Sequence, residues 1–199
     1  MAFSLEPVHA NLHLVEDTIC LLKEEWPNCL AERLHLIETP QCTGLPCSLI
    51  LIMTQARGGA TTTKEVVGHV RVCGVPGDEN RVYAEAVVIK KSRRNEGLGK
   101  KLHHLMEDYS RRCFKVRYIH VTTEKQESAE FYKHLKYDPY PTLVPIIASN
   151  ILRTYHGVKW KGLVIPKELE HFYEGEEVPD TATSSTRHFV VDLDKSCTE

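Results

Sequence analysis

A glycine-containing turn between two segments of different periodicity constrains the fold of this chain most. The turn, residues 94–99, reads Arg-Asn-Glu-Gly-Leu-Gly, which is an R-x-x-G-x-G pattern. The preceding residues 83–89 are apolar and rich in β-branched side chains, which predicts a buried strand. From Leu98 to Cys113 the apolar residues recur at spacings of three, four and seven, which predicts a helix. The sequence therefore predicts a strand, a glycine turn and a helix in direct succession.

This succession is typical of a phosphate-binding site. The first turn of a helix carries unpaired N–H groups and partial positive charge, and glycine lets a bulky anion approach the backbone closely. The G-x-G-x-x-G of dinucleotide-binding folds and the G-K-[ST] of Walker loops are both absent. With arginine at its first position, the turn resembles the acetyl-CoA signature of the GNAT superfamily of N-acetyltransferases, which binds the pyrophosphate of coenzyme A.

A second segment extends the resemblance. Residues 116–123 predict another strand, and residues 128–137 predict a short helix that matches the superfamily at Ala129, Phe131, Tyr132 and Tyr137. Lys136 stands where the superfamily usually has glycine, so we expect this helix to end differently.

The order of the remaining segments fits the same fold. Helices are predicted over residues 11–25 and 30–37, strands over 48–55 and 66–75, and a closing strand over 187–193. The resemblance implies an α/β GNAT fold, with a mixed central β-sheet flanked by helices and two splayed strands that receive acetyl-CoA. We expect a single N-acetyltransferase domain over residues 1–199, with an acidic, Ser/Thr-rich loop at about 174–186 before the last strand.

Composition narrows the classes of partner and compartment. A formal net charge of −2 gives no global attraction to nucleic acid or to an anionic membrane. Because no apolar run reaches the length of a membrane span and no signal-peptide core is present, we expect a cytoplasmic protein. The 7 cysteines are odd in number and include no C-x-x-C pair, which favours reduced thiols and no metal site. We also expect a monomer.

The resemblance implies acetyl-CoA as the cosubstrate and places it on two sets of residues. The pantetheine arm is expected on the main chain of Val87, Val88 and Ile89. The pyrophosphate is expected against Arg94, Asn95, Gly97, Leu98, Gly99 and Lys100. A main-chain N–H at a strand bulge would stabilise the developing oxyanion, so no covalent enzyme intermediate is needed.

Three residues are candidates for proton transfer. Tyr132 matches the superfamily tyrosine that protonates the departing thiolate, and an ordinary buried tyrosine fits the same position equally well. By period two, Glu85 shares a strand face with Val87 and Ile89. A carboxylate in an apolar strand is costly unless it is used or paired, so Glu85 is either the general base or a partnered structural residue. His120, on the facing strand, is the alternative base.

Candidate acceptor-binding residues lie in two other segments. Trp26, Arg33 and His35 fall between the first two helices, where N-terminal acetyltransferases close over the incoming peptide. His69 and Arg71 share one strand face. Arginine binds carboxylates well, which favours an acidic peptide, although either arginine could instead be solvated or paired with a local glutamate.

Scattered segments resemble one family within the superfamily, the actin N-terminal acetyltransferases. These segments are residues 5–9, 26–27, 33–35, 67–71, 85–88 and 131–135. The resemblance implies the acidic N-terminus of processed actin as acceptor, alone or as an actin–profilin complex. Some members contact profilin through a polyproline run, which this chain lacks. Acetylation of a lysine, polyamine or small amine, and a non-enzymatic acetyl-CoA-binding module, remain alternative interpretations.

Overall fold

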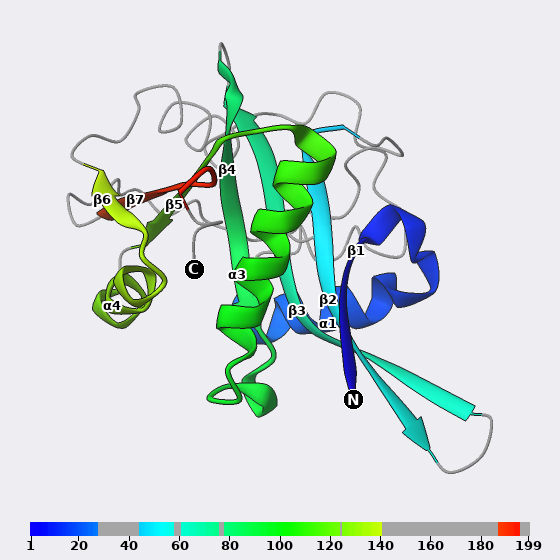
Figure 1. Ribbon diagram of the computed structural model, residues 1–199. Coiled ribbons are helices and arrows are strands. Elements are labelled where there is room, and N and C mark those ends of the chain that lie inside the picture. The colour runs from blue at the N-terminus through cyan, green and yellow to red at the C-terminus, as the bar shows by residue number, and fades with distance from the viewer. Residues whose placement is uncertain (28–43, 58–60, 76–77, 124, 141–186, 196–199) are drawn as a thin grey trace, which may run out of the picture.

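A mixed sheet forms the centre of the protein. The computed structural model describes residues 1–27, 44–57, 61–75, 78–123, 125–140 and 187–195. Within these ranges, one 7-stranded sheet has the order β1-β2-β3-β4-β5-β7-β6. Helix α3 crosses one face of the sheet and α1 lies on the opposite face (Figure 1). This arrangement confirms the predicted α/β class with a mixed central sheet flanked by helices.

The strands divide the sheet into an antiparallel half and a mixed half. The antiparallel half consists of β1 (Ala2–Pro7), β2 (Cys47–Arg57), β3 (Thr61–Val75) and β4 (Asp78–Ile89). In the other half, β5 (Tyr118–Thr123) runs parallel to β4, and β7 (Arg187–Asp192) is antiparallel to β5 and to β6 (Asp138–Tyr140). The sequence did not predict β1 or β6. Strand β6 has 3 residues, too few for a periodic pattern.

The helices follow the predicted apolar stripes with shifted ends. They are η1 (Val8–Ala10), η2 (Leu12–Leu14), α1 (Val15–Glu25), η3 (Lys91–Arg93), α3 (Leu98–Tyr109), the π-helical η4 (Ser110–Phe114) and α4 (Gln126–His134). The first predicted helix, 11–25, thus begins with one 3-10 turn, η2, and the long helix changes to π geometry after Tyr109. No helix in the described ranges is long and apolar enough to cross a membrane. The predicted helix 30–37 and acidic loop 174–186 lie outside the described residues.

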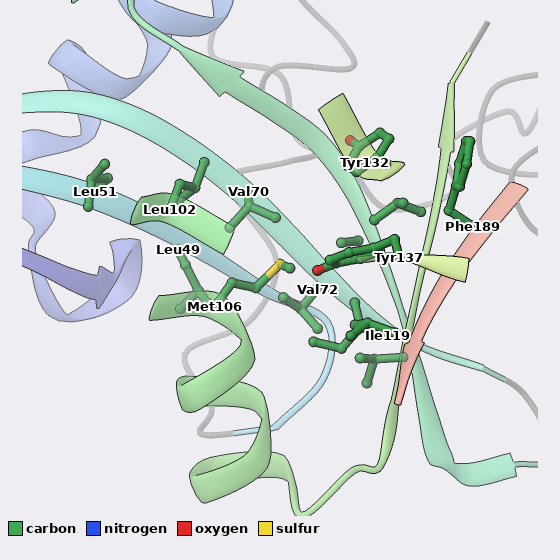
Figure 2. Packing of buried hydrophobic residues seen from close by; sticks show 14 of the residues in the cluster. Leu49, Leu51, Val70, Val72, Leu102, Met106, Ile119, Tyr132, Tyr137 and Phe189 are labelled. Carbon is green, nitrogen blue, oxygen red and sulfur yellow. The ribbon is translucent and has the colours of Figure 1, made fainter. Parts of the chain in front are cut away.

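Two apolar clusters hold the helices on the sheet. Leu102 and Met106 of α3 pack with Leu49 and Val70 of the sheet, in a cluster that also includes Tyr132 of α4 (Figure 2). On the opposite face, residues of α1 pack against Ile50, Ile52, Val66 and Val88. Burial of these side chains provides the main driving force for docking both helix layers.

The end of α4 corrects one expectation from the sequence. Lys136 follows the helix with φ 63°, the left-handed conformation that glycine usually supplies at this position. The helix therefore does not end differently for lack of glycine. For a residue with a Cβ, this conformation costs roughly 1–2 kcal/mol. The neighbouring Tyr137, which is buried with its hydroxyl donating to Glu107, helps to hold the turn.

Strands β4 and β5 diverge partway along their length. Their parallel pairing runs from Arg81 opposite Tyr118 to Ala84 opposite Val121, and the ladder ends there. Beyond this point β4 continues to Ile89, while β5 pairs with β7 to its end at Thr123. This confirms the predicted splay between the two strands.

Candidate active site

A β-bulge lies in β4 where the strand leaves β5. His69 of β3 pairs with Val88 and Arg71 pairs with Glu85, so Val70 alone faces both Ala86 and Val87. Ala86 takes φ 48°, in the left-handed region. The extra residue therefore inverts the alternation of side chains along β4. Each residue after the bulge points to the face opposite to the one that the pattern before the bulge predicts.

The bulge overturns the predicted position of Glu85. Val87 and Ile89 pack against the cluster beneath α3 and α4, whereas Ala86 packs with the cluster beneath α1. Val70 belongs to the cluster beneath α3, so its neighbour Arg71 points to the opposite face, beneath α1. Glu85 is paired with Arg71 and lies on that same face. The prediction that Glu85 shares a face with Val87 and Ile89 is wrong, because the extra residue inverts the alternation.

His69 contacts the bulge directly. Its Nδ1 lies 3.0 Å from the carbonyl oxygen of Ala86, and since a carbonyl only accepts, Nδ1 is the protonated nitrogen. The ring is 0% exposed, and Nε2 has no hydrogen-bond partner among the described residues. Burial lowers the pKa of His69 to about 4, and the charge of Arg71 lowers it as well, against the opposing bond to Ala86. The imidazole is therefore neutral at physiological pH.

Glu85 belongs to a buried polar cluster with Arg71 and Cys73. The guanidinium Nη1 of Arg71 donates to Glu85 Oε1 over 3.2 Å, and the Cys73 thiol donates to the same oxygen over 3.4 Å. The side chains of Arg71 and Glu85 are only 3% and 10% exposed. Because arginine is always charged, the pair favours the ionised carboxylate, which is the form a general base needs. Burial and the nearby Glu85 raise the pKa of Cys73, so this thiol stays protonated.

His120 is held by a second polar contact on the neighbouring strands. Nη1 of Arg81 lies 3.1 Å from His120 Nε2, and the guanidinium also donates to Asp78 over 2.8 Å. Because arginine can only donate, Nε2 is the accepting nitrogen and carries no proton. His120 is fully buried. It could act as a base only after its Nε2 exchanges Arg81 for another partner.

Tyr83 connects these groups to Tyr132. The Tyr83 hydroxyl lies 2.7 Å from Thr122 Oγ1, across the point where β4 and β5 separate. Burial raises the pKa of Tyr83, and the nearby Glu85 and Tyr132 raise it further, against the bond to Thr122. Tyr83 thus lies close enough to Glu85 and to Tyr132 for each of them to raise its pKa.

Tyr132 has the protonation state required of a general acid. Its ring packs against Tyr137 and Phe189, each at a centroid distance of 5.7 Å (Figure 2). The ring of His103 lies 5.4 Å from it. Burial raises the pKa of its phenol to about 12. No hydrogen bond of its hydroxyl is found within the described residues. The phenol therefore keeps its proton at neutral pH, and no described side chain accepts that proton in a hydrogen bond.

The glycine turn leads into the N-terminus of α3 as predicted. Gly97 caps the helix with φ 75°, no side chain caps the first turn, and no acidic residue lies in that turn. A Cβ on Gly99 would lie 3.2 Å from Cζ of Phe131, so glycine lets α3 approach α4 closely. Asn95 also has a left-handed φ, of 67°. Leu98 is buried and Lys100 is exposed at the same helix end.

Arg94 is engaged with a carboxylate from the other end of the sequence. Its Nε donates to the carbonyl of Ile89 over 3.1 Å, and its Nη2 donates to Glu25 over 2.5 Å. Lys125, just before α4, donates to the other Glu25 oxygen over 3.4 Å. Burial opposes ionisation of Glu25, but the bonds to Arg94 and Lys125 outweigh it and lower the pKa of this carboxyl. Glu25 therefore links α1 to residues that follow both splayed strands.

These features fit acetyl-CoA. The edge of β4 beyond Ala84, which no longer pairs with β5, can bind an extended pantetheine arm through its main chain, as predicted for Val87, Val88 and Ile89. The uncapped N-terminus of α3 can bind the pyrophosphate, with Arg94 and Lys100 as cations. The sequence did not indicate Glu25, Arg81 or Lys125, because the contacts that bring them to this site join residues 39 to 100 positions apart in the chain.

The predicted acceptor-binding residues are only partly described. Trp26 is 37% exposed directly after α1, close to the Glu25 bridge. His69 and Arg71 are buried on the α1 side of the sheet, and Arg71 is paired with Glu85. Arg33 and His35 lie outside the described residues. Binding of an acceptor by this set remains a prediction.

Comparisons with known proteins agree with this geometry. Residues 16–137 match the model of the acetyltransferase (GNAT) family. N-alpha-acetyltransferase 80 of Mus musculus is 34% identical over 118 residues, which cover 59% of this chain and 35% of the relative. The chain thus spans about a third of the length of that curated relative.

Solved structures show the same fold at low sequence identity. A GNAT-family acetyltransferase from Staphylococcus aureus superposes with a TM-score of 0.55 at 15% identity. The superposition covers 96% of this chain and 99% of the bacterial chain. An aminoglycoside 6'-N-acetyltransferase in complex with coenzyme A superposes with a TM-score of 0.51 at 17% identity, covering 72% of this chain and 88% of its own.

Proposed function

Because the chain belongs to the acetyltransferase (GNAT) family, whose cosubstrate is acetyl-CoA, we propose that it acetylates the free α-amine of acidic protein N-termini. Processed actin is the leading acceptor, in the cytoplasm, alone or as an actin–profilin complex. The observation that carries the α-amine is the 34% identity to an N-alpha-acetyltransferase. The actin acceptor rests on the resemblance of the scattered segments described above.

The first part of the mechanism is the stabilisation of charge on the acetyl carbonyl. Acetyl-CoA supplies the acetyl group as a thioester, held by the main chain of β4 and by the N-terminus of α3. The N–H of Val87, at the bulge, is the donor best placed to stabilise a developing oxyanion, because β4 is no longer paired with β5 there. Direct attack by the amine then needs no covalent enzyme intermediate.

Tyr132 supplies the proton that the leaving thiolate requires. Its phenol stays protonated at neutral pH because burial raises its pKa to about 12, and its hydroxyl makes no competing hydrogen bond within the described residues. A phenol in this state can act as a general acid towards a thiolate. Its ring packs on Phe189, which pairs with Val121 at the end of the β4–β5 ladder, and this supports a role near the splay, where pantetheine is expected.

Glu85 is the preferred base, acting through water. Its carboxylate is kept ionised by Arg71, whereas the Nε2 lone pair of His120 is already occupied by Arg81. A weak base suffices for an α-amine, since its pKa is about 7.7–8.0, against about 10.4 for lysine. A peptide α-amine therefore supplies more neutral nucleophile at cellular pH than a lysine does.

Recognition of acidic residues falls mainly to Arg33 and His35 in this proposal. Arg71 is committed to Glu85, so its removal would leave a buried carboxylate uncompensated and would cost about 3–5 kcal/mol of stability. A variant of Arg71 therefore cannot test acceptor binding cleanly. Arg33→Ala tests it better, with Arg112→Ala as a matched charge control, because Arg112 is exposed in η4, which follows the far end of α3.

The experiment measures coenzyme A release with three sets of peptides. These are acidic free N-termini (Asp-Asp-Asp and Glu-Glu-Glu), neutral free N-termini that start with Met or Ser, and N-blocked lysine peptides. We expect a strong preference for the acidic set, which Arg33→Ala reduces selectively and Arg112→Ala leaves unchanged. Preferred turnover of lysine peptides, or an equal loss on acidic and neutral peptides in Arg33→Ala, would contradict the proposed acceptor.

Tyr132→Phe tests whether the protein is an enzyme of this mechanism. We expect the turnover rate to fall on the order of 100-fold or more, while the affinity for acetyl-CoA changes by less than about threefold. Tyr109→Phe is the matched control, because its hydroxyl lies beside Cys47 and Cys113. Acetyl-CoA binding without turnover in the unmodified protein would instead support a non-enzymatic binding module.

A further inference from the structure

The bulge in β4 depends on a backbone conformation that is unfavourable by itself. Ala86 has φ 48° although it carries a Cβ, which costs roughly 1–2 kcal/mol. Such a conformation persists only where the surrounding structure holds it. At this point one residue of β3 faces two residues of β4, so the regular ladder cannot supply both bonds.

His69 adds a side-chain contact to the main chain at this bulge. Its Nδ1–H donates to the Ala86 carbonyl over 3.0 Å, and the fully buried ring has little room to take another orientation. Nε2 makes no hydrogen bond within the described residues. A buried polar ring with a single polar contact is best explained by what that contact holds in place.

The held carbonyl belongs to the same peptide unit as the N–H of Val87. In a planar trans peptide the C=O and the N–H point in opposite directions. Because the Ala86 carbonyl points towards His69, the Val87 N–H must point away from it. His69 lies on the α1 side of the sheet, and Tyr132 belongs to the cluster on the other side.

We infer that His69 is a positioning residue for acetyl transfer: its bond to the Ala86 carbonyl aims the Val87 N–H at the acetyl carbonyl. The inference rests on the proposed acetyl transfer but not on the choice of acceptor. It gives His69 a role through the backbone, whereas the sequence suggested contact with substrate. The neutral state of the ring suits this role, since burial lowers the pKa of His69 to about 4 and keeps Nε2 unprotonated.

Two polar substitutions separate positioning from general structural support. His69→Asn places an amide N–H near the position of Nδ1, whereas His69→Gln places it one bond further, near the position of Nε2. The two side chains have the same amide group and similar costs of burial, so folding differences between them should be small. Both variants are compared with the unmodified protein in single-turnover acetyl transfer to the preferred peptide.

We expect His69→Asn to retain the rate within about threefold and His69→Gln to lose about 10- to 100-fold, part of the effect of removing an oxyanion donor. Affinity for coenzyme A, which has no acetyl carbonyl, should change by less than about threefold in both. The acceptor KM and the acid limb of the pH–rate profile should also stay unchanged in His69→Asn.

A direct spectroscopic measurement complements the rates. The amide proton of Val87 should shift more on addition of a non-transferable ketone analogue of acetyl-CoA than on addition of coenzyme A, and His69→Gln should remove the difference. Equal rates in the two variants, a parallel loss of coenzyme A affinity, or a lost acid limb in His69→Asn would each overturn the inference. Absence of acetyl transfer by the unmodified protein would instead refute the proposed function.

Discussion

Gly68 is predicted to be the glycine of β3 at which a methyl group is least tolerated. A Cβ at this position would lie 2.8 Å from Cδ1 of Ile89, 3.2 Å from the carbonyl oxygen of Val88 and 3.3 Å from Cβ of Leu51. The Ile89 methyl group can rotate away, but the other two atoms are fixed by the backbones of β4 and β2. Gly68→Ala must therefore push the neighbouring strands apart.

The expected cost combines two opposing terms. Overpacking of a core costs about 1–3 kcal/mol, and replacement of glycine by alanine recovers about 0.4–1 kcal/mol through the unfolded chain. The net loss is up to about 2.6 kcal/mol, which lowers Tm by up to about 10 °C for a chain of this size. Because Val88 and Ile89 are predicted to bind the pantetheine arm, affinity for coenzyme A should fall as well.

Gly74→Ala is the matched control in the same strand. Its Cβ would meet only Leu45 side-chain atoms, at 3.6 and 3.9 Å, which are ordinary contact distances. We expect this variant to keep its Tm or raise it slightly, with unchanged coenzyme A affinity. Thermal unfolding and calorimetric titration with coenzyme A measure both effects. An equal Tm for the two variants would refute the reasoning from close approach at Gly68.

Two further predictions concern charge. Burial lowers the pKa of His103 to about 3 and that of His69 to about 4, below the ordinary 6.5. The contribution of these two neutral histidines to the free energy of unfolding is therefore present above pH 6.5 and is lost as the pH falls. Each histidine should lower the free energy of unfolding by about 2 kcal/mol between pH 7 and pH 5. In denaturant unfolding, His103→Gln should therefore lose less stability over this pH range than the unmodified protein does. Arg94→Gln should weaken coenzyme A binding about tenfold, whereas Glu25→Gln should strengthen it by releasing Arg94, as measured by titration calorimetry. Weaker binding in Glu25→Gln would show that Glu25 orients Arg94 instead of competing for it.

The segments that the sequence predicted well are those whose structure depends on local pattern. The apolar stripe of α3 and the glycine turn before it are set by residues close together in the chain, and both are confirmed. The change to π geometry after Tyr109 was not predicted, because an apolar stripe does not distinguish between the two helix types.

The resemblance implied a strand bulge, but its position at Ala86 could not be predicted, for a different reason. Apart from Glu85, residues 83–89 are apolar on both faces of the strand, so their pattern carries no information about the place of an extra residue. Glu85 was therefore assigned to the wrong face. The pairing of Arg71 with Glu85 was left open by the sequence and follows only from the register of β3 against β4.

The inverted face of Glu85 has a mechanistic consequence. Transfer without a covalent intermediate needs one group to remove a proton from the amine and another to protonate the thiolate, and the two must not exchange that proton directly. Glu85 lies on the α1 side of β4, where its partners Arg71 and Cys73 come from β3, and Tyr132 belongs to the opposite layer. With the amine approaching from the side of Glu85 and the thiolate leaving on the side of Tyr132, the acetyl group would separate the base from the acid. A strand without the bulge would place Glu85 on the same face as Val87, beside the cofactor edge, and this separation would be lost.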